Sequence, residues 1–382
     1  MQRQPSTPRP QWEKELEEIG FTFHGLDGGY WTEDACYELM PREVDELESA
    51  TAELHERCCE AAGRIITGRR LDQLRIPTVW HQEIIESWEE DEPYLYGRMD
   101  LVYDGTGPPK LLEYNADTPT ALLEAAVAQW HWLEAARPGA DQFNSLHERL
   151  IERWKTVRSA LSTDELHLTG LSESEEDTQT LAYLTDVAQQ AGFRTVPVAI
   201  DRIGWDPRLR EFVDESDHRI EALFKLYPWE WMINEPFAPH LLEASLYLIE
   251  PAWKMLLSNK GILACLWEYF PDHPNLLPAY LESDRLTGSY VRKPLWSREG
   301  ANVTIVEPSG RTETEGAYGA EGFVYQAYQP LSHFDGWHPV IGSWVIGDEP
   351  AGIGIREDRD RVTHNRSRFT PHYFMPKEKR RS

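Results

Sequence analysis

Residues 98–120 read RMDLVYDGTGPPKLLEYNADTPT, two runs of branched and aromatic residues separated by a turn rich in Gly and Pro. This pattern is typical of a β-hairpin, and the period of two in a strand places alternate side chains on one face. Arg98 and Asp100 therefore share a face of the first strand, and Glu113 and Asn115 share a face of the second. If the strands pair, one cation and three oxygen donors meet on one side of the hairpin.

This group of side chains has two interpretations. Carboxylate and amide oxygens are the donors that Mg2+ takes when it also keeps waters and substrate phosphates, and Arg98 would suit such a site if a phosphate lay between it and the ion. Alternatively, the hairpin has a solvated face with a cross-strand ion pair worth less than about 1 kcal/mol. Periodicity alone does not separate the two interpretations.

The residues that follow the second predicted strand indicate the start of a helix. Thr118 is suited to an N-cap and Pro119 to the first helical position, because proline lacks the N–H that this position leaves unpaired. Asp117 is then expected to brace the turn. Apolar residues at helical spacing form the predicted buried stripe: Leu122, Leu123, Ala126, Val127 and Trp130.

Periodicity along the rest of the chain predicts a mixed fold of α/β and α+β parts. Apolar residues at helical spacing predict a long helix from Glu43 to about Gly68, and Ser145 with Glu148 has the spacing of a capping box that opens a helix through Arg158. A strand–helix–strand pattern between about 165 and 201 predicts a βαβ unit. From about 250, helices alternate with expected strands at 290–293, 303–306, 323–327, 341–346 and 352–356.

Composition limits the class of protein. The chain has 382 residues, 41% of them hydrophobic, and a formal net charge of -27. The apolar content suffices for a large core, whereas the charge would repel nucleic-acid phosphates and anionic membranes, so we expect neither partner. The four cysteines form no C-x-x-C pair and no signal peptide is evident, which favours a cytoplasmic protein. Residues 1–11 are expected to be disordered and residues 378–382 to be a basic tail.

A second polar segment, VRKPLWSREGANV at 291–303, combines a strand carrying Lys293 with a loop of small and polar residues at 297–302. The backbone N–H groups of such a loop could close over phosphates. The chain contains no G-x-x-x-x-G-K-[ST], no G-x-S-x-G and no H-E-x-x-H, which disfavours a Walker-type site and the common hydrolases. Glu113 and Asp117 as a glycosidase pair are weakly supported, because the chain has 65 acidic residues.

Five segments together resemble the glutathionylspermidine synthase family, ATP-grasp ligases that join a peptide carboxylate to an amine. They are RMDLVYDGTGPPKLLEYNADTPT, FKLYPWEW, EPAWKMLLSNKGIL, YVRKPLWSREGANV and GSWVIGDEPAGIGIRED. The resemblance runs from about residue 12 to 377 and is nearest to the stand-alone bacterial acid–amine ligases, which have the synthetase region only. Nothing here resembles the amidase domain of the bifunctional members, so amide hydrolysis is not expected.

The resemblance implies an ATP-grasp fold, with a pre-ATP-grasp-like α/β lobe at about 165–235 and the ATP-grasp lobes at about 250–377. It implies catalytic roles for Arg98, as transition-state stabiliser, and Arg356. The implied metal ligands are Asp100, Glu113 and Asn115, and Thr118 and Thr120 are implied to meet the substrate. The implied ATP-binding residues are Arg98, Met99, Asp100, Lys260, Lys293, Gly300, Gln326, Gln329, Arg361, Val362 and Thr363.

The implied reaction uses ATP as co-substrate and Mg2+, as two ions. ATP phosphorylates a carboxylate, and an amine then displaces phosphate from the acylphosphate. Two alternatives stay open: a nucleotide-binding module without catalysis, and a peptide ligase of the glutathione synthetase type. The resemblance fixes neither the acid nor the amine, because the region around KLYPWEW departs from the glutathione-using members, and the oligomeric state is equally unspecified.

Overall fold

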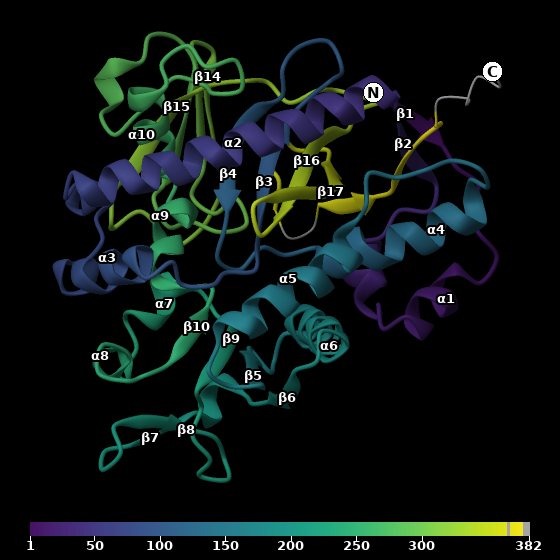
Figure 1. Ribbon diagram of the computed structural model, residues 1–382. Coiled ribbons are helices and arrows are strands. Elements are labelled where there is room, and N and C mark those ends of the chain that lie inside the picture. The colour runs from purple at the N-terminus through teal and green to yellow at the C-terminus, as the bar shows by residue number, and fades with distance from the viewer. Residues whose placement is uncertain (365–366, 377–382) are drawn as a thin grey trace, which may run out of the picture.

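The computed structural model describes residues 1–364 and 367–376. Two five-stranded sheets lie next to each other, and a parallel sheet with its helices lies below them in the view of Figure 1. The structure therefore has the mixed α/β character that the sequence predicts. Within the described ranges, the structure has no helix both long enough and apolar enough to cross a membrane.

The predicted hairpin is confirmed and forms one edge of an antiparallel sheet with the order β18-β17-β16-β3-β4. Arg98 lies opposite Asn115, and Asp100 lies opposite Glu113. The strands of this sheet are β3 (Tyr96–Val102), β4 (Lys110–Asn115), β16 (His338–Ile346), β17 (Glu349–Asp358) and β18 (Arg368–Thr370).

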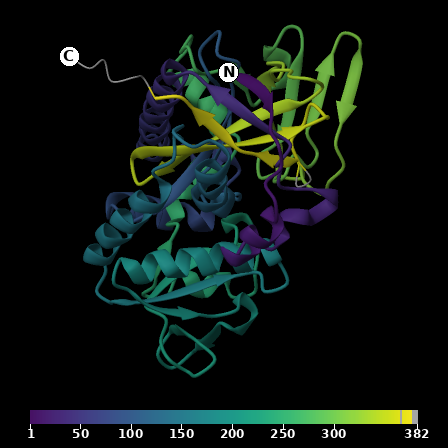
Figure 2. The ribbon, with the colours of Figure 1, turned by 90° about the vertical axis from the view of Figure 1, so that its right-hand side faces the viewer.

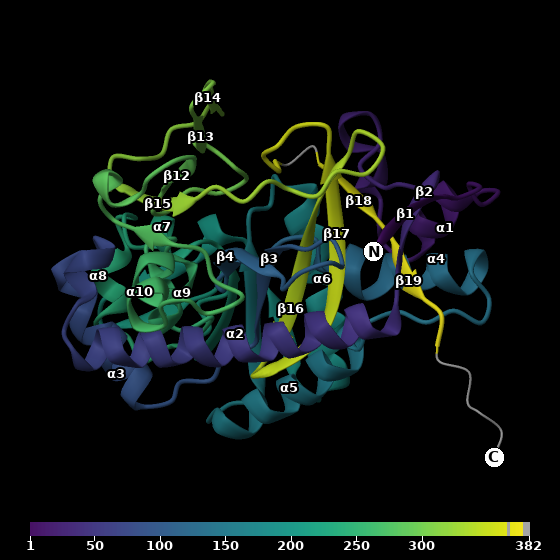
Figure 3. The same cartoon turned by 90° about the horizontal axis from the view of Figure 1, so that it is seen from above.

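The long helix predicted from Glu43 is α2 (Pro41–Thr67), and it ends at Gly68. It packs against β16 and β17, and Figure 3 shows it running along one side of both five-stranded sheets, below them in that view. Its apolar stripe is buried, including Leu47, Leu54 and Ile65 at 0% exposure. Burial of this stripe joins α2 directly to the first sheet, and to the second sheet through helix α10 (Ile262–Tyr269).

The second five-stranded sheet is also antiparallel, with the order β11-β15-β12-β13-β14. Helix α10 (Ile262–Tyr269) contacts β11 and β15 of this sheet. The strands are β11 (Ala279–Tyr280), β12 (Tyr290–Pro294), β13 (Thr304–Glu307), β14 (Gly310–Glu313) and β15 (Phe323–Ala327). The strands predicted near 290, 303 and 323 are thus confirmed, as are those at 341 and 352 in the first sheet.

The predicted βαβ unit belongs to a parallel sheet with the order β10-β9-β5-β6, seen at the lower end of Figure 2. From β5 the chain passes through α6 to β6 on one side, and later returns to β9 and β10 on the other. The β5/β9 boundary is therefore a topological switch point, where α/β sheets commonly bind ligands at the carboxyl ends of the strands. The elements are β5 (Glu165–Gly170), α6 (Glu175–Gln190), β6 (Arg194–Pro197), β9 (Ala222–Leu226) and β10 (Tyr247–Ile249).

Shorter elements connect these sheets. The two-stranded ribbon of β7 and β8 projects from the parallel sheet at the bottom of Figure 1. The other α-helices and the ribbon strands are α1 (Trp12–Glu18), α3 (His81–Glu89), α4 (Gln129–Ala136), α5 (Leu146–Ala160), α7 (Trp229–Met232), α8 (Ala238–Leu241), α9 (Met255–Ser258), β7 (Gly204–Asp206) and β8 (Glu211–Val213).

The N-terminal segment is ordered, in contrast to the prediction of disorder for residues 1–11. Strand β1 (Gln2–Pro5) pairs with β2 (Ala35–Leu39), which also pairs with β19 (His372–Phe374). The Met1 ammonium lies 2.5 Å from the Glu43 carboxylate. These long-range partners satisfy a polar segment that has little apolar periodicity of its own. The predicted basic tail at 378–382 lies outside the described residues.

Two predicted helix starts differ from the structure. The helix expected at Thr118 begins at Leu122, after Ala121 in the left-handed region at φ 67°. It continues as a π-helical turn (Glu124–Ala128), a distortion often found near functional sites. The helix expected after Ser145 is present as α5, but the Ser145 hydroxyl donates to the carbonyl of Ala351 and forms no capping box.

Candidate active site

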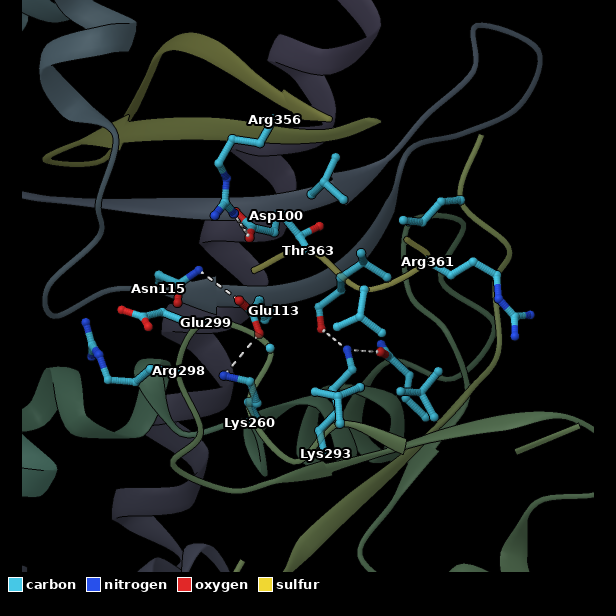
Figure 4. Close-up of a pocket in the computed structure, with 18 of the residues that line it drawn as sticks. Asp100, Glu113, Asn115, Lys260, Lys293, Arg298, Glu299, Arg356, Arg361 and Thr363 are labelled. Carbon is cyan, nitrogen blue, oxygen red and sulfur yellow. Dashed lines mark hydrogen bonds and ion pairs between the residues drawn. The ribbon is translucent and has the colours of Figure 1, made fainter. Parts of the chain in front are cut away.

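A pocket lies between the two five-stranded sheets, and the hairpin face predicted to carry chemistry lines it (Figure 4). Because Arg98 pairs with Asn115 and Asp100 with Glu113 across β3 and β4, all four side chains reach one region. The pocket also contains nearly every other predicted site residue: Thr118, Thr120, Lys260, Lys293, Gly300, Gln326, Gln329, Arg356, Arg361, Val362 and Thr363.

Asp100 lies between two arginines. Arg98 Nε donates to Asp100 Oδ1 at 2.7 Å, and an Arg356 guanidinium nitrogen donates to Oδ2 at 2.7 Å. Burial lowers the pKa of Arg98, but the Asp100 carboxylate more than offsets this effect, so the pKa lies above its ordinary value. Asp100 therefore orients two permanent positive charges at the pocket floor.

Glu113 is held by a lysine and an amide. Lys260 Nζ lies 3.0 Å from Glu113 Oε2, and Asn115 Nδ2 donates to Oε1 at 3.2 Å. Burial would raise the pKa of Glu113, yet the charges of Lys260 and Lys293 lower it to about 2. Glu113 is therefore a carboxylate at neutral pH, with two oxygens directed into a cationic part of the pocket.

Lys293 extends from β12 into the deeper part of the pocket. Its ammonium donates to the Leu112 carbonyl and to Gln326 Oε1, both at 2.8 Å. Gln326 in turn donates to the Leu111 carbonyl at 3.0 Å, which links the two sheets across the pocket. Burial lowers the pKa of Lys293 to about 8, although the charge of Glu113 opposes this shift.

Apolar side chains and the loop at 297–302 complete the part of the pocket around Lys293. Gly300 has φ 69°, and a Cβ at this position would lie 2.4 Å from the Thr363 carbonyl oxygen. Only glycine therefore allows the loop at 297–302 to approach residues 361–363 so closely. Arg361 donates to Glu307 at 2.7 Å in the outer wall. The apolar lining residues include Leu112, Val291, Val303, Ile305, Leu331 and Val340.

Met99 differs from the implied assignment. Its side chain is 0% exposed and belongs to the hydrophobic core on the opposite face of β3. The alternation that brings Arg98 and Asp100 into the pocket necessarily directs the intervening residue away from it. A contact from Met99 to a ligand would have to come from its backbone.

Arg298 and Glu299 line the pocket but were not singled out from the sequence. An Arg298 nitrogen donates to Thr118 Oγ1 at 2.6 Å, and another lies 3.3 Å from Glu230. Because Thr118 accepts this hydrogen bond, its hydroxyl serves the pocket wall rather than a helix cap. The polar loop at 297–302 was the available signal, but its partners lie far away in the sequence.

The end of the pocket near Thr118 has an acidic flank. Glu176 and Asp177, from the first turn of α6, lie close enough to Glu299 for their charges to interact. Burial, with the charges of Glu124, Asp177 and Glu299, raises the pKa of Glu176 to about 8. This flank stands at the carboxyl end of β5, beside the switch point of the parallel sheet.

Comparison with known proteins gives the family. The family model described as "Glutathionylspermidine synthase preATP-grasp" matches residues 3–375. The chain belongs to the glutathionylspermidine synthase family. A Haemophilus influenzae protein provisionally named acid–amine ligase is 44% identical over 385 residues, covering 96% of this chain and 98% of that protein.

More distant relatives are longer than this chain. Trypanothione synthetase of Crithidia fasciculata is 30% identical over 346 residues, which cover 81% of this chain and 52% of that protein. The bifunctional glutathionylspermidine synthetase/amidase of Escherichia coli is 26% identical over 368 residues, covering 88% and 58%. The match thus spans little more than half of each of these two relatives.

A solved structure supports the fold assignment. The glutathione synthetase-like effector of Globodera pallida superposes with a TM-score of 0.59 at 9% identity, covering 95% of this chain and 96% of that one. At this identity the likeness concerns the fold alone. The chain therefore has a glutathione synthetase-like fold within an ATP-grasp-related family.

Proposed function

We propose that this protein is an ATP-dependent ligase that joins a carboxylic acid to an amine, releasing ADP and phosphate. Its relatives are named as ligases and synthetases, which makes it a carbon–nitrogen ligase. The observation that carries the proposal is the placement of Arg98, Arg356, Lys260 and Lys293 around three oxygen donors in one pocket. Phosphoryl transfer needs cationic stabilisation and positioning, and requires no nucleophilic side chain of the enzyme.

The donor set fits magnesium. Asp100 and Glu113 offer carboxylate oxygens, and Asn115 offers an amide oxygen, on adjacent strands of one sheet. Among the described residues, arginine, lysine and amide groups pair with these oxygens. The two carboxylate charges are therefore balanced by cationic side chains. Mg2+ held here would neutralise phosphate charge during transfer. Two ions and the role of each ligand are part of this proposal.

The first step would transfer the γ-phosphoryl group to the acid. A carboxylate oxygen of the substrate attacks phosphorus, the bond to the β-phosphate oxygen breaks, and ADP leaves with the electron pair. Arg98 and Arg356 would stabilise the charge on the transferring group, because both guanidiniums are fixed by Asp100. Lys260 and Lys293 would hold the phosphates of ATP, with the apolar wall and residues 326–329 facing the adenine.

The second step would form the amide. The amine nitrogen attacks the acyl carbon, the bond from carbon to the phosphate oxygen breaks, and the nitrogen loses a proton. An ammonium group at the end of the pocket where Thr118 and Arg298 lie would favour loss of the proton from Glu176, so the flank of Glu176, Asp177 and Glu299 would gain negative charge as the amine binds. Short peptides are suitable acids and polyamines suitable amines, since relatives are named for glutathionylspermidine.

A substrate screen tests the proposal. The protein would be incubated with Mg2+, ATP and pairs of acids and amines, including glutathione, shorter peptides, spermidine and simple diamines. We expect one pair to produce ADP together with a product whose mass equals acid plus amine minus water. The proposal fails if no pair yields ADP while an Asp100→Asn variant binds Mg-ATP as tightly as the wild type.

A further inference from the structure

The turn at 116–121 is attached to the parallel α/β lobe by one buried ion pair. Lys225, at the carboxyl end of β9, is 0% exposed, and its Nζ donates to Asp117 Oδ1 at 2.5 Å. Asp117 Oδ2 accepts from the backbone N–H of Trp229 at 2.7 Å. Both carboxylate oxygens of Asp117 therefore bind the lobe, which agrees with the prediction that Asp117 braces the turn.

The same turn contacts the reacting end of the pocket on its other side. Arg98 donates to the Thr120 carbonyl at 2.6 Å, and Arg298 donates to Thr118 Oγ1 at 2.6 Å. The turn ends in Ala121 at φ 67°, an unfavourable conformation for a residue with a Cβ. Such a turn keeps its shape only where outside contacts hold it.

We propose that Lys225 is a positioning residue: through Asp117 it fixes the turn at 118–120, and thereby sets the acid substrate against the γ-phosphate. This inference rests on the proposed function. The lysine touches neither nucleotide site nor metal donor, since its described polar contacts are Asp117 and the Tyr227 carbonyl. Its Nζ also lies 4.9 Å from the centroid of the Trp229 ring, which further restricts the ammonium.

The test uses a double variant, because removing one partner leaves an unpaired buried charge and can prevent folding. Asp117→Asn with Lys225→Met removes both charges and keeps the side-chain volumes similar. The matched control is Arg9→Met with Glu33→Gln, a buried pair at 2.7 Å whose residues line neither the pocket nor the turn. Both variants would be compared with the wild type in the full chain.

Three measurements distinguish positioning from a structural role. In the Asp117/Lys225 variant we expect faster amide hydrogen exchange at 116–121, unchanged binding of a non-hydrolysable ATP analogue with Mg2+, and a near wild-type melting temperature. With the acid–amine pair found for the wild type, kcat should fall on the order of 100-fold while KM for ATP changes by less than about threefold. The control variant should show none of these changes.

The proposal is overturned if exchange at 116–121 and turnover match the wild type in the Asp117/Lys225 variant. It is also overturned if that variant fails to fold while the control variant folds, because the pair would then serve stability. Failure of the proposed function is a separate result: the wild type would form no amide with any acid–amine pair. Hydrogen exchange would still decide whether Lys225 holds the turn.

Discussion

The two ends of the pocket are built differently. At the end proposed to bind the nucleotide, Lys293 and Gln326 extend from strands and hydrogen-bond to backbone carbonyls of β4. At the substrate end, Thr118, Arg298 and Glu176 come from a turn, a loop and a helix start in three separate parts of the chain. Both ends therefore join distant parts of the chain, but the first is built on hydrogen-bonded strands and the second on a turn, a loop and a helix start.

This difference separates what the two ends can control. Backbone-anchored lysines suit the nucleotide of the proposed reaction, which stays the same whichever acid and amine are joined. Loop residues can change without disturbing a sheet, and binding specificity commonly resides in loops on a rigid scaffold. We therefore expect substitutions at the nucleotide end to change the KM for ATP, and those at the substrate end to change the KM for the acid or amine.

The largest effect should come from Asp100, which binds both Arg98 and Arg356. Asp100→Asn removes the carboxylate that orients Arg98 and Arg356 and weakens the predicted metal site, so kcat should fall on the order of 10³-fold. ADP release at saturating substrates measures this. Asp104→Asn is the control, because Asp104 lies in the turn of the same hairpin and accepts from Thr106 outside the pocket. If only the KM for ATP rose and kcat stayed unchanged, this role of Asp100 in the chemical step would be contradicted.

The hairpin was predictable from sequence for a physical reason. Strand alternation and a turn rich in Gly and Pro are local signals, and together they bring Arg98 and Asp100 to one face opposite Glu113. The same alternation should have excluded the Met99 side chain, which lies in the core. Lys260 could be named only through the family resemblance, because no motif marks it, whereas Lys293 also stood out in the polar segment at 291–303.

The turn after the hairpin shows why the rest could not be predicted. Thr118 and Pro119 have the local chemistry of a helix start, yet the helix begins at Leu122. Two long-range hydrogen bonds hold the turn in place. Lys225 binds Asp117 from 108 residues away in the sequence, and Arg298 binds Thr118 from 180 residues away. Long-range hydrogen bonds of this kind outweigh a helix cap worth about 1 kcal/mol.

Arg298→Gln tests the substrate end. Loss of the guanidinium removes its hydrogen bond to Thr118 and its ion pair with Glu230, so the KM for the acid or amine should rise about 10- to 100-fold. The KM for ATP should stay near the wild-type value. Arg292→Gln is a matched control, because Arg292 on β12 pairs with Glu313 on β14 and does not line the pocket. An equal rise in the KM for ATP would show that Arg298 serves the nucleotide instead.

Gly300→Ala tests the junction of the loop with residues 361–363. The added Cβ would meet the Thr363 carbonyl at 2.4 Å, so the loop must shift, and the KM for ATP should rise about tenfold. Gly288→Ala is the control: Gly288 also has positive φ, 95°, but no atom within 4 Å of the added Cβ. Equal effects of the two substitutions would assign the change to backbone strain, and not to the contact with Thr363.

The smallest effect concerns pH and Lys293, whose pKa burial lowers to about 8. Phosphate beside the ammonium favours the protonated form, so binding above pH 8 must take up a proton. The affinity for Mg-ATP should then weaken as pH rises from 8 to 9.5, by at most about tenfold per pH unit. Titrations of the wild type and of Lys293→Met measure this, and the variant should lack the dependence.

The free protein should respond to pH in the opposite direction. Lys293 has lost its proton above about pH 8 in the folded state, whereas a lysine in the unfolded chain keeps it up to about 10.5. The unfolded state therefore binds more protons in this interval, and the free energy of unfolding should rise with pH, relative to Lys293→Met. If the free energy of unfolding and the affinity for Mg-ATP both fell as the pH rose, Lys293 would not be a buried, partly neutral lysine facing the phosphates.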